Sequence, residues 1–246
     1  MIPRTGNGKF ECVILSENHF MPYKSEYICS MRLFLFFALA FCLFQSCTNK
    51  TDQKLPILGN RELIERNVNG KVVIDTIYQT IPPFSYLNQD SILITDKDFD
   101  GKIYVADFFF TACNTICPVM HRNMLEVYKK FKDNPEVKFL SHSIDIKYDL
   151  PSRLKTYAKK LGVEGNQWEF VHGSKDSIFN VAAKSYLVSA FEDSTDPQGL
   201  VHQGWFILVD KKKQLRGAYD GTKEDQVKQL MLDMDKLLAE EKMNEK

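Results

Sequence analysis

The apolar positions of this chain change their period along the sequence, and these changes predict where strands and helices lie. Residues 103–110 form a short, almost wholly apolar run, which predicts a central strand that is buried on both faces. Residues 118–131 carry apolar side chains three and four positions apart, and Pro118 suits the first turn of a helix. Residues 137–144 return to strand character. A buried strand, a helix and a second strand are therefore predicted in succession.

The rest of the chain continues this alternation. Residues 84–87 and 92–94 flank a polar turn segment, which predicts a hairpin ahead of the buried strand. The later elements are predicted as helices near 152–161 and 175–186, strands at 168–171, 205–209 and 215–219, and a last helix after Thr222. Thr222 and Asp225 have the spacing of a capping box for that helix. This alternation implies one α/β domain with a mixed sheet at residues 74–246.

The segment before the domain resembles an export signal. The apolar run 33–44 follows a basic residue and is shorter than the roughly 20 apolar residues that span a bilayer. Ser46 directly before Cys47 resembles a bacterial lipoprotein signal, in which the cysteine is lipidated. We therefore expect a signal peptide at 31–46, lipid on Cys47, and a domain outside the cytoplasm, on the periplasmic side of the cell envelope. An ordinary secretory signal or a short uncleaved anchor is the alternative.

Two further segments complete the expected organisation. Residues 1–30 have mixed charges and no apolar period, so we expect translation to start at Met31 and residues 1–30 to be an untranslated or non-native extension. Residues 47–73 are polar with weak periodicity, which predicts a tether. Of the 6 cysteines, only Cys113 and Cys117 then remain for chemistry in the mature domain.

Composition excludes one class of partner. Lys plus Arg and Asp plus Glu both total 32, so the formal net charge is +0 and no overall field attracts polyanions. The aromatic residues, 12% of the chain, are not interleaved with basic residues as a nucleic-acid platform requires. Nucleic acid is therefore not expected as a partner.

The candidate chemistry lies where the buried strand gives way to the helix. Cys113 and Cys117 are four residues apart, so a helical chain places both on one side. The N–H groups and dipole at a helix N-terminus stabilise a thiolate and favour both nucleophilic attack and metal binding. Thiolates are soft ligands that select Cu(I), or zinc where the other ligands suit it. A local disulfide or two buried thiols is the alternative.

His202 is a third candidate ligand. It lies in the polar stretch 198–203 directly before a predicted strand, and loops at strand ends are where α/β sheets place reactive groups. Two thiolates and one imidazole form a credible site for one copper ion with an open coordination position. The alternative is that His202 is a solvated side chain in an exposed loop.

Other residues near the cysteines are weaker candidates. His121 lies in the first turn of the predicted helix and is a reserve ligand. Met120 and Met124 could donate thioether sulfur, although their helical spacing favours a place in the core. His142 and His172 are interpreted as solvated.

Together these residues resemble the Sco/SenC copper chaperones, which help to assemble the binuclear copper centre of cytochrome c oxidase. The resemblance runs from about residue 83 to residue 237. It is carried by Asp107-Phe108-Phe109-Phe110-Thr111 leading into Cys113 and Cys117, by Ser143-Ile144-Asp145 with Asp149 four residues on, and by His202 eight residues before Asp210.

The resemblance implies a fold, a ligand set and a partner. The fold would be a thioredoxin-like mixed sheet flanked by helices, with an N-terminal β-hairpin. Cys113, Cys117 and His202 would hold one copper ion, and the cysteine pair could also cycle between dithiol and disulfide. The client would be a cytochrome c oxidase subunit or another copper protein, reached from a membrane anchor. Asp145 and Asp149 would form an acidic segment near the site; helix capping by Asp149 and a solvated Asp145 are the alternative.

The chain departs from the family pattern in two places. Asn114 replaces the proline that commonly follows the first cysteine, and Ile146 and Leu150 replace a proline and a threonine in the acidic segment. These departures indicate a divergent member. It either delivers copper to, or reduces the cysteines of, the copper centre of a respiratory oxidase, or it serves another copper enzyme or acts mainly as a thiol reductant.

Three functions are compatible with the cysteine pair. In the first, a copper chaperone binds the ion with its reduced dithiol and passes it to a partner by stepwise thiolate exchange. In the second, a thiol-disulfide oxidoreductase of the cell envelope uses the same pair without metal. In the third and weakest, a peroxidase-like enzyme oxidises one cysteine to sulfenic acid.

Overall fold

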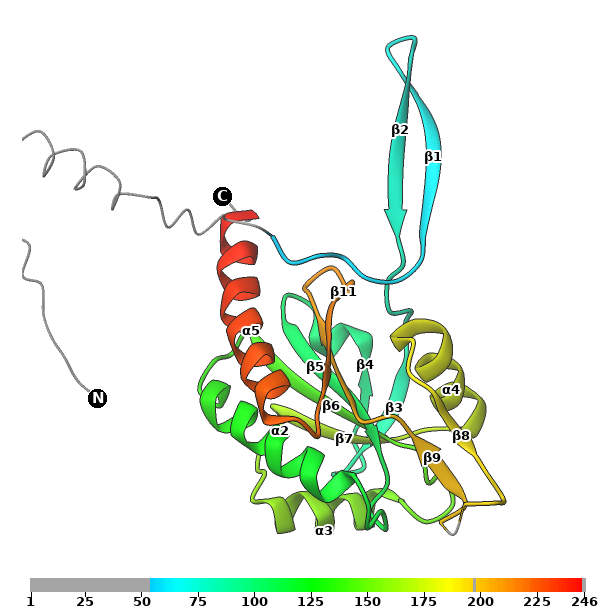
Figure 1. Ribbon diagram of the computed structural model, residues 1–246, viewed down its shortest axis with the longest axis vertical. Helices are drawn as coiled ribbons and strands as arrows, with labels where there is room; N and C mark the ends of the chain where they lie inside the picture. The colour runs from blue at the N-terminus through cyan, green and yellow to red at the C-terminus, as the bar shows by residue number, and fades with distance from the viewer. Residues whose placement is uncertain (1–53, 197, 245–246) are drawn as a thin grey trace, which may run out of the picture. The chain divides into compact units, whose positions relative to one another are not determined.

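The computed structural model describes residues 54–244 with the exception of residue 197. A seven-stranded sheet with the order β11-β10-β5-β6-β7-β3-β4 lies at its centre (Figure 1). Its strands are β3 (Ser85–Asn88), β4 (Leu93–Thr95), β5 (Ile103–Phe109), β6 (Val137–Ser143), β7 (Trp168–His172), β10 (Trp205–Val209) and β11 (Leu215–Asp220). The three central strands β5, β6 and β7 are parallel, and the outer strands join antiparallel on both sides. The mixed α/β sheet and the hairpin β3–β4 expected from the sequence are confirmed.

The two central strands β5 and β6 are buried along their whole length, as the apolar run predicted for β5. Parallel strands are joined by crossovers through a helix, so their carboxyl ends meet at one edge of the sheet. The loops that follow β5 and β6 therefore lie side by side at that edge. This edge carries the cysteine pair.

Within residues 54–244, four α-helices flank the sheet: α2 (Cys117–Phe131), α3 (Pro151–Leu161), α4 (Lys175–Asn180) and α5 (Glu224–Asn244). Helix α2 packs on α5, α5 contacts β5 and β11, and α3 contacts β3 and β7. The 3-10 turn Asp96–Phe99 precedes β5. The helix predicted at 175–186 has the expected extent, but it continues beyond α4 as a π-helical segment, Val181–Tyr186.

The predicted capping box of the last helix is wrong. A capping Thr222 hydroxyl would accept a hydrogen bond from a helix N–H, but this hydroxyl donates one of 2.6 Å to Asp220. The helix begins at Glu224, so Lys223 and not Thr222 directly precedes it. The Thr222 N–H also donates to the Asp220 side chain, at 3.0 Å. A turn centred on Asp220 therefore uses the groups that the sequence spacing assigned to a cap.

The segment expected to be a tether contains regular structure. Strands β1 (Arg61–Val68) and β2 (Lys71–Tyr78) form an antiparallel hairpin, separate from the central sheet, where weak periodicity predicted loose chain. Asn69 and Gly70 form its two-residue turn with φ values of 54° and 78°. An Asn-Gly pair accepts positive φ at both positions, which favours the tight hairpin turn. The Asn69-Gly70 dipeptide was therefore a sequence signal for this hairpin that the tether prediction did not use.

A second small hairpin also differs from expectation. The polar stretch 198–203 was not predicted to contain a strand, but β8 (Ala190–Glu192) pairs antiparallel with β9 (Leu200–His202). His202 is thus the last residue of a strand and lies opposite Ala190. Strands of three residues are too short to show a period of two, which explains why the pattern did not reveal them.

The predictions for the N-terminal region fall on residues that the structure does not describe. The extension at 1–30, the signal at 31–46 and the lipidated Cys47 all lie outside residues 54–244. Within the described residues, no helix is both long enough and apolar enough to cross a membrane.

Candidate metal centre

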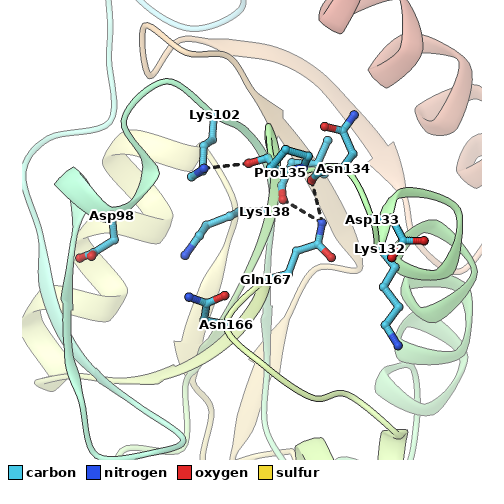
Figure 2. A pocket seen from close by; sticks show the side chains of 10 residues that line it. Asp98, Lys102, Lys132, Asp133, Asn134, Pro135, Lys138, Asn166 and Gln167 are labelled. Carbon is cyan, nitrogen blue, oxygen red and sulfur yellow. Dashed lines mark hydrogen bonds between the residues drawn. The ribbon is translucent and has the colours of Figure 1, made fainter.

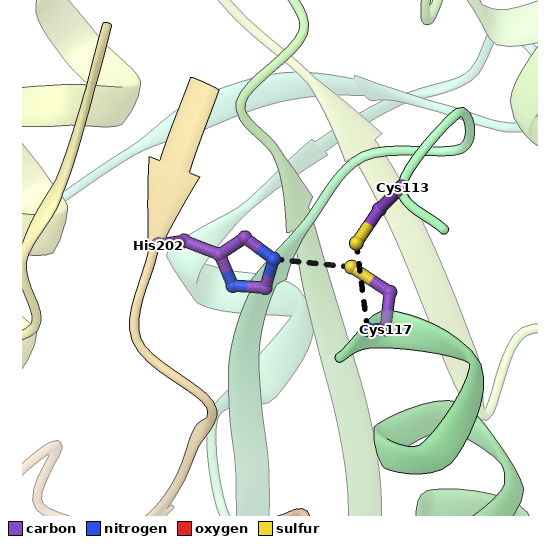
Figure 3. Close-up of side chains that lie close together, drawn as sticks. All are labelled: Cys113, Cys117 and His202. Atoms are coloured by element: carbon purple, nitrogen blue, oxygen red, sulfur yellow. Dashed lines mark hydrogen bonds between the residues drawn. The ribbon is translucent and has the colours of Figure 1, made fainter. Parts of the chain in front are cut away.

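The cysteine pair lies at the junction between β5 and α2. Cys117 is the first residue of α2, whereas Cys113 lies in the turn before it, so the expectation that both lie on the helix is only half right. The Cys117 backbone N–H donates to the Cys113 sulfur at 3.4 Å, which places Cys113 Sγ at the helix N-terminus (Figure 3). Pro118 follows in the first turn, where its missing N–H costs nothing. Neither cysteine forms a disulfide, and both are buried.

His202 reaches the same place from the hairpin β8–β9. Its Nε2 lies 3.1 Å from Cys117 Sγ, and its Nδ1 lies 3.3 Å from the carbonyl oxygen of Gln203 (Figure 3). The side chain is buried, so the interpretation of His202 as a solvated loop residue is wrong. The ligand atoms of Cys113, Cys117 and His202 all lie within 4.8 Å of one another. Residues 85 positions apart in the sequence therefore converge on one point.

The two thiols have opposite pKa shifts. The hydrogen bond from the Cys117 thiol lowers the pKa of Cys113 to about 3, and His202 and the Thr115 hydroxyl act in the same direction, against the effect of burial. The same hydrogen bond, together with burial, raises the pKa of Cys117 far above its usual range. At neutral pH the pair therefore shares one proton, with Cys113 as the thiolate and Cys117 as the thiol.

Asp149 fixes the loop that carries the cysteines. Its carboxylate is fully buried, and it accepts hydrogen bonds from the Thr111 N–H at 2.8 Å and the Ser143 hydroxyl at 2.7 Å. Arg153 lies 3.5 Å from it and balances the charge. The capping role suggested for Asp149 is wrong, because the N-cap of α3 is Leu150. Asp149 instead ties the loops after β5 and β6 together.

Asp145 is the other member of the acidic segment. It is 8% exposed, so the interpretation as a solvated side chain is wrong, and burial raises the pKa of its carboxyl. Its Oδ1 accepts a hydrogen bond of 3.1 Å from the Tyr148 N–H, which shapes the loop after β6.

The reserve ligand His121 has other partners. Its Nε2 lies 3.0 Å from Asp107 and its Nδ1 lies 2.7 Å from the Tyr157 hydroxyl. Among residues 54–244, the group of possible metal ligands contains Cys113, Cys117 and His202 and does not include His121. Sequence reasoning missed Asp107 as the partner of His121; a charged residue inside an apolar strand was the signal.

The remaining candidates belong to the interior. Met120 and Met124 are fully buried members of the core, as their spacing favoured. His142 is fully buried as well, so its interpretation as solvated is wrong, and His172 is half-buried. Asn114, which departs from the family pattern, is exposed.

The tip of the hairpin β8–β9 was not identified from the sequence as part of the site. Gln198 donates a hydrogen bond of 3.3 Å from Nε2 to the Ala112 carbonyl, next to Cys113. The hairpin is thus attached to the cysteine loop at its tip as well as at His202.

A polar cavity of about 470 Å³ lies apart from this centre and shares no residue with it (Figure 2). Two of its polar side chains are bound by the backbone around them. Lys102 donates to the Pro135 carbonyl at 2.7 Å, and Gln167 Nε2 donates to three carbonyls, those of Phe131, Asn134 and Val137. The Gln167 Oε1 atom is buried without a hydrogen-bond partner in the described part of the chain, so the polar lining is satisfied only in part.

Comparison with known proteins gives one consistent family. The family model described as SCO1/SenC matches residues 75–239. The SCO1 protein homolog of Bacillus subtilis is 32% identical over 154 residues, which cover 62% of this chain and 79% of that protein.

The similar solved structures agree. A SCO1/SenC family lipoprotein from Bacillus anthracis is 28% identical with a TM-score of 0.60, over 66% of this chain and 96% of that one. BsSco, described as a member of the Sco family of cytochrome c oxidase assembly proteins with a disulfide switch, is 29% identical with a TM-score of 0.55, over 64% and 94%. Copper-bound ScoI of Bradyrhizobium japonicum is 23% identical and shares the fold, with a TM-score of 0.53 over 64% and 99%.

The fold is thus the thioredoxin-like fold of these structures. The family model covers most of the residues that the structure describes, including both cysteines and His202. The chain belongs to the SCO1/SenC family.

Proposed function

We propose that this chain is a copper chaperone that binds one copper ion through Cys113, Cys117 and His202 and delivers it to the copper centre of a respiratory oxidase. The observation that carries the proposal is the convergence of two sulfur atoms and one imidazole nitrogen within 4.8 Å. Thiolate and imidazole donors suit copper, and their number leaves a coordination position open. A relative with the same fold has been solved with copper bound.

The residues of the chain prepare the site for the ion. The Nδ1–H of His202 donates to the Gln203 carbonyl, so that Nε2 presents its lone pair to the site. Cys113 is already a thiolate, and the Cys117 thiol, whose proton is directed to Cys113, has its sulfur 3.1 Å from Nε2. Copper binding displaces that proton, and a docking partner then replaces the sulfur ligands one at a time.

A copper titration tests the ligand set. The reduced wild-type chain is expected to bind one equivalent, and His202→Ala is expected to bind about 100-fold more weakly because it loses the only nitrogen donor of the group. His172→Ala is the matched control, since His172 is half-buried and lies outside the group. Unchanged affinity in His202→Ala would refute the assignment.

The place of action follows from the N-terminal sequence and one relative. The Bacillus anthracis structure is described as a lipoprotein, and Cys47 here follows a signal-like run. The domain would therefore act at the outer face of the membrane, anchored by lipid on Cys47, close to membrane-bound oxidases. Labelling with a radioactive fatty acid that persists in Cys47→Ser would contradict this anchor.

A thiol-disulfide oxidoreductase is the second candidate function, favoured by the low pKa of Cys113. The Cys113 thiolate would attack a partner disulfide and displace one partner thiolate. Cys117, having lost its proton, would then attack Cys113 Sγ and release the second partner thiolate. The chain would be oxidised by two electrons and the partner reduced by two. Full disulfide reductase activity without copper binding would establish this function in place of the first.

A further inference from the structure

The hairpin β1–β2 is an incomplete sheet. It extends away from the seven-stranded sheet, and neither strand pairs with another strand among residues 54–244 (Figure 1). Leu63, Val72 and Ile74 lie on one of its faces with exposed fractions of 70%, 66% and 65%. A two-stranded hairpin is marginally stable in water, whereas additional strands beside it provide both hydrogen bonds and apolar contacts. These features indicate that β1–β2 is completed by another chain.

The outer edge of β1 is free to pair. Asn60 O accepts a hydrogen bond of 2.9 Å from Gln79 N, so position 60 faces β2. In an antiparallel pair, the backbone N–H and C=O groups of successive residues point alternately toward the partner strand and away from it. Because Asn60 faces β2, the groups of Arg61, Leu63 and Glu65 point outward. Each of these three residues is exposed. The edge therefore offers a row of backbone groups to a new strand.

The charges on the outer edge of β1 are complementary to those on the same edge of a second copy of the chain. Residues 61–66 read Arg-Glu-Leu-Ile-Glu-Arg, so Arg61 and Glu65 carry opposite charges at equal distances on either side of Leu63. If a second copy of β1 runs antiparallel with Leu63 opposite Leu63, Arg61 of each chain lies opposite Glu65 of the other. Opposite charges in directly facing positions stabilise a sheet, and like charges destabilise it.

The ion pairs within the hairpin favour the same register. Arg66 already pairs with Asp75 at 2.6 Å, whereas Arg61 and Glu65 form no ion pair within the described part of the chain. Their partners across the hairpin are Tyr78 and Ile74, which carry no charge at neutral pH. A second copy would supply the missing partner for both.

We propose that the chain forms a two-fold symmetric dimer through antiparallel β1–β1 pairing centred on Leu63, giving a four-stranded sheet. The pairing is isologous, as expected for closed two-fold assemblies. It does not involve the cysteines or His202, so it is independent of copper binding.

Sedimentation analysis of the full chain in mild detergent, with three variants, tests the dimer. The wild-type chain is expected to dimerise. Glu65→Arg places two arginines opposite each other at both ends of the pairing and should weaken dimerisation about tenfold or more. The double variant Arg61→Glu with Glu65→Arg exchanges the charges and should restore it. Glu62→Arg is the matched control, because position 62 lies opposite Ile64 and its charge should be tolerated.

Three results would overturn the proposal. The first is a wild-type chain that stays monomeric at every concentration. The second is a Glu65→Arg chain that dimerises as well as the wild type. The third is a double variant that remains as weak as Glu65→Arg. Copper stoichiometry measured on the same samples should be unchanged in every variant, which separates failure of the dimer from failure of the copper site.

Discussion

At the scale of residues, the candidate metal centre is characterised by which of its ligand atoms carry a proton in the free chain. Cys113 is held as a thiolate while Cys117 keeps its proton, because one sulfur donates a hydrogen bond to the other. The imidazole of His202 is oriented by the Gln203 carbonyl on one nitrogen and Cys117 on the other. Only the Cys117 proton must therefore leave before all three side chains can bind a metal ion.

Copper binding at neutral pH should release about one proton, because ligands must be deprotonated and only Cys117 still carries a proton to lose. Calorimetric titration in two buffers with different ionisation enthalpies measures this number. Release of two protons would mean that Cys113 is a thiol in the free chain, and release of none would mean that Cys117 is not a ligand.

A second residue-scale prediction concerns His142. Burial lowers its pKa from 6.5 to about 4, and its Nε2 has no hydrogen-bond partner in the described part of the chain. The unfolded chain therefore binds a proton at this position between about pH 6.5 and pH 4, and the folded chain does not. The free energy of unfolding should fall across that window by about 3 kcal/mol on account of this group.

The variant His142→Phe isolates this effect. Phenylalanine does not titrate, and it can keep the stacking on Phe108, whose ring centroid lies 4.7 Å from that of His142. Urea unfolding at several pH values should show a shallower acid dependence in the variant. Equal slopes in the two proteins would contradict the prediction.

At the scale of elements, the site is assembled by short segments that are tied to each other. Helix α2 and the turn before it supply the cysteines, and the hairpin β8–β9 supplies His202. Asp149 joins the loops after β5 and β6, and Gln198 joins the hairpin to the cysteine turn. The histidine is thus delivered by a small separate hairpin rather than by the central sheet.

Arg216 on β11 binds the segment 54–58, which precedes β1, to the rest of the domain. Its guanidinium donates to the carbonyls of Leu55 and Pro56 and pairs with Asp210 at 3.0 Å and Glu240 at 2.8 Å. The arginine is buried, so its removal leaves two buried carboxylates without their cation. Arg216→Ala should cost about 3–5 kcal/mol of the free energy of unfolding.

Lys130→Ala provides the control for Arg216→Ala. Lys130 pairs with Asp235 at 2.6 Å on the surface, and exposed pairs contribute about 0–1 kcal/mol. Urea unfolding should therefore show a much larger loss of unfolding free energy in Arg216→Ala than in Lys130→Ala. Equal losses would show that the buried ion pairs do not hold the segment 54–58.

At the scale of the whole molecule, local patterns in the sequence predicted the elements that carry the site. The apolar run of β5, the start of α2 near Pro118 and the hairpin β3–β4 all depend on neighbouring residues, so they were readable without a structure. The π-helical end of the helix after β7 depends on packing, and no period in the sequence distinguished it from α-helix.

The candidate site was predictable only in part, because its members are distant in the sequence. The spacing of Cys113 and Cys117 is local, but the place of His202 before a predicted strand was also compatible with a solvated side chain, and the resemblance to the family favoured the ligand. The role of Asp149 was also missed, because its partner Thr111 lies 38 positions away, in the loop after β5. Long-range contacts of this kind leave no periodic trace in the chain.

X-ray absorption spectroscopy of the copper-loaded chain identifies the ligand set, because it counts the atoms bound to the ion. We expect two sulfur neighbours and one imidazole nitrogen, with the nitrogen lost in His202→Ala while both sulfurs remain. A wild-type spectrum with no nitrogen neighbour, or with a single sulfur, would contradict this ligand set.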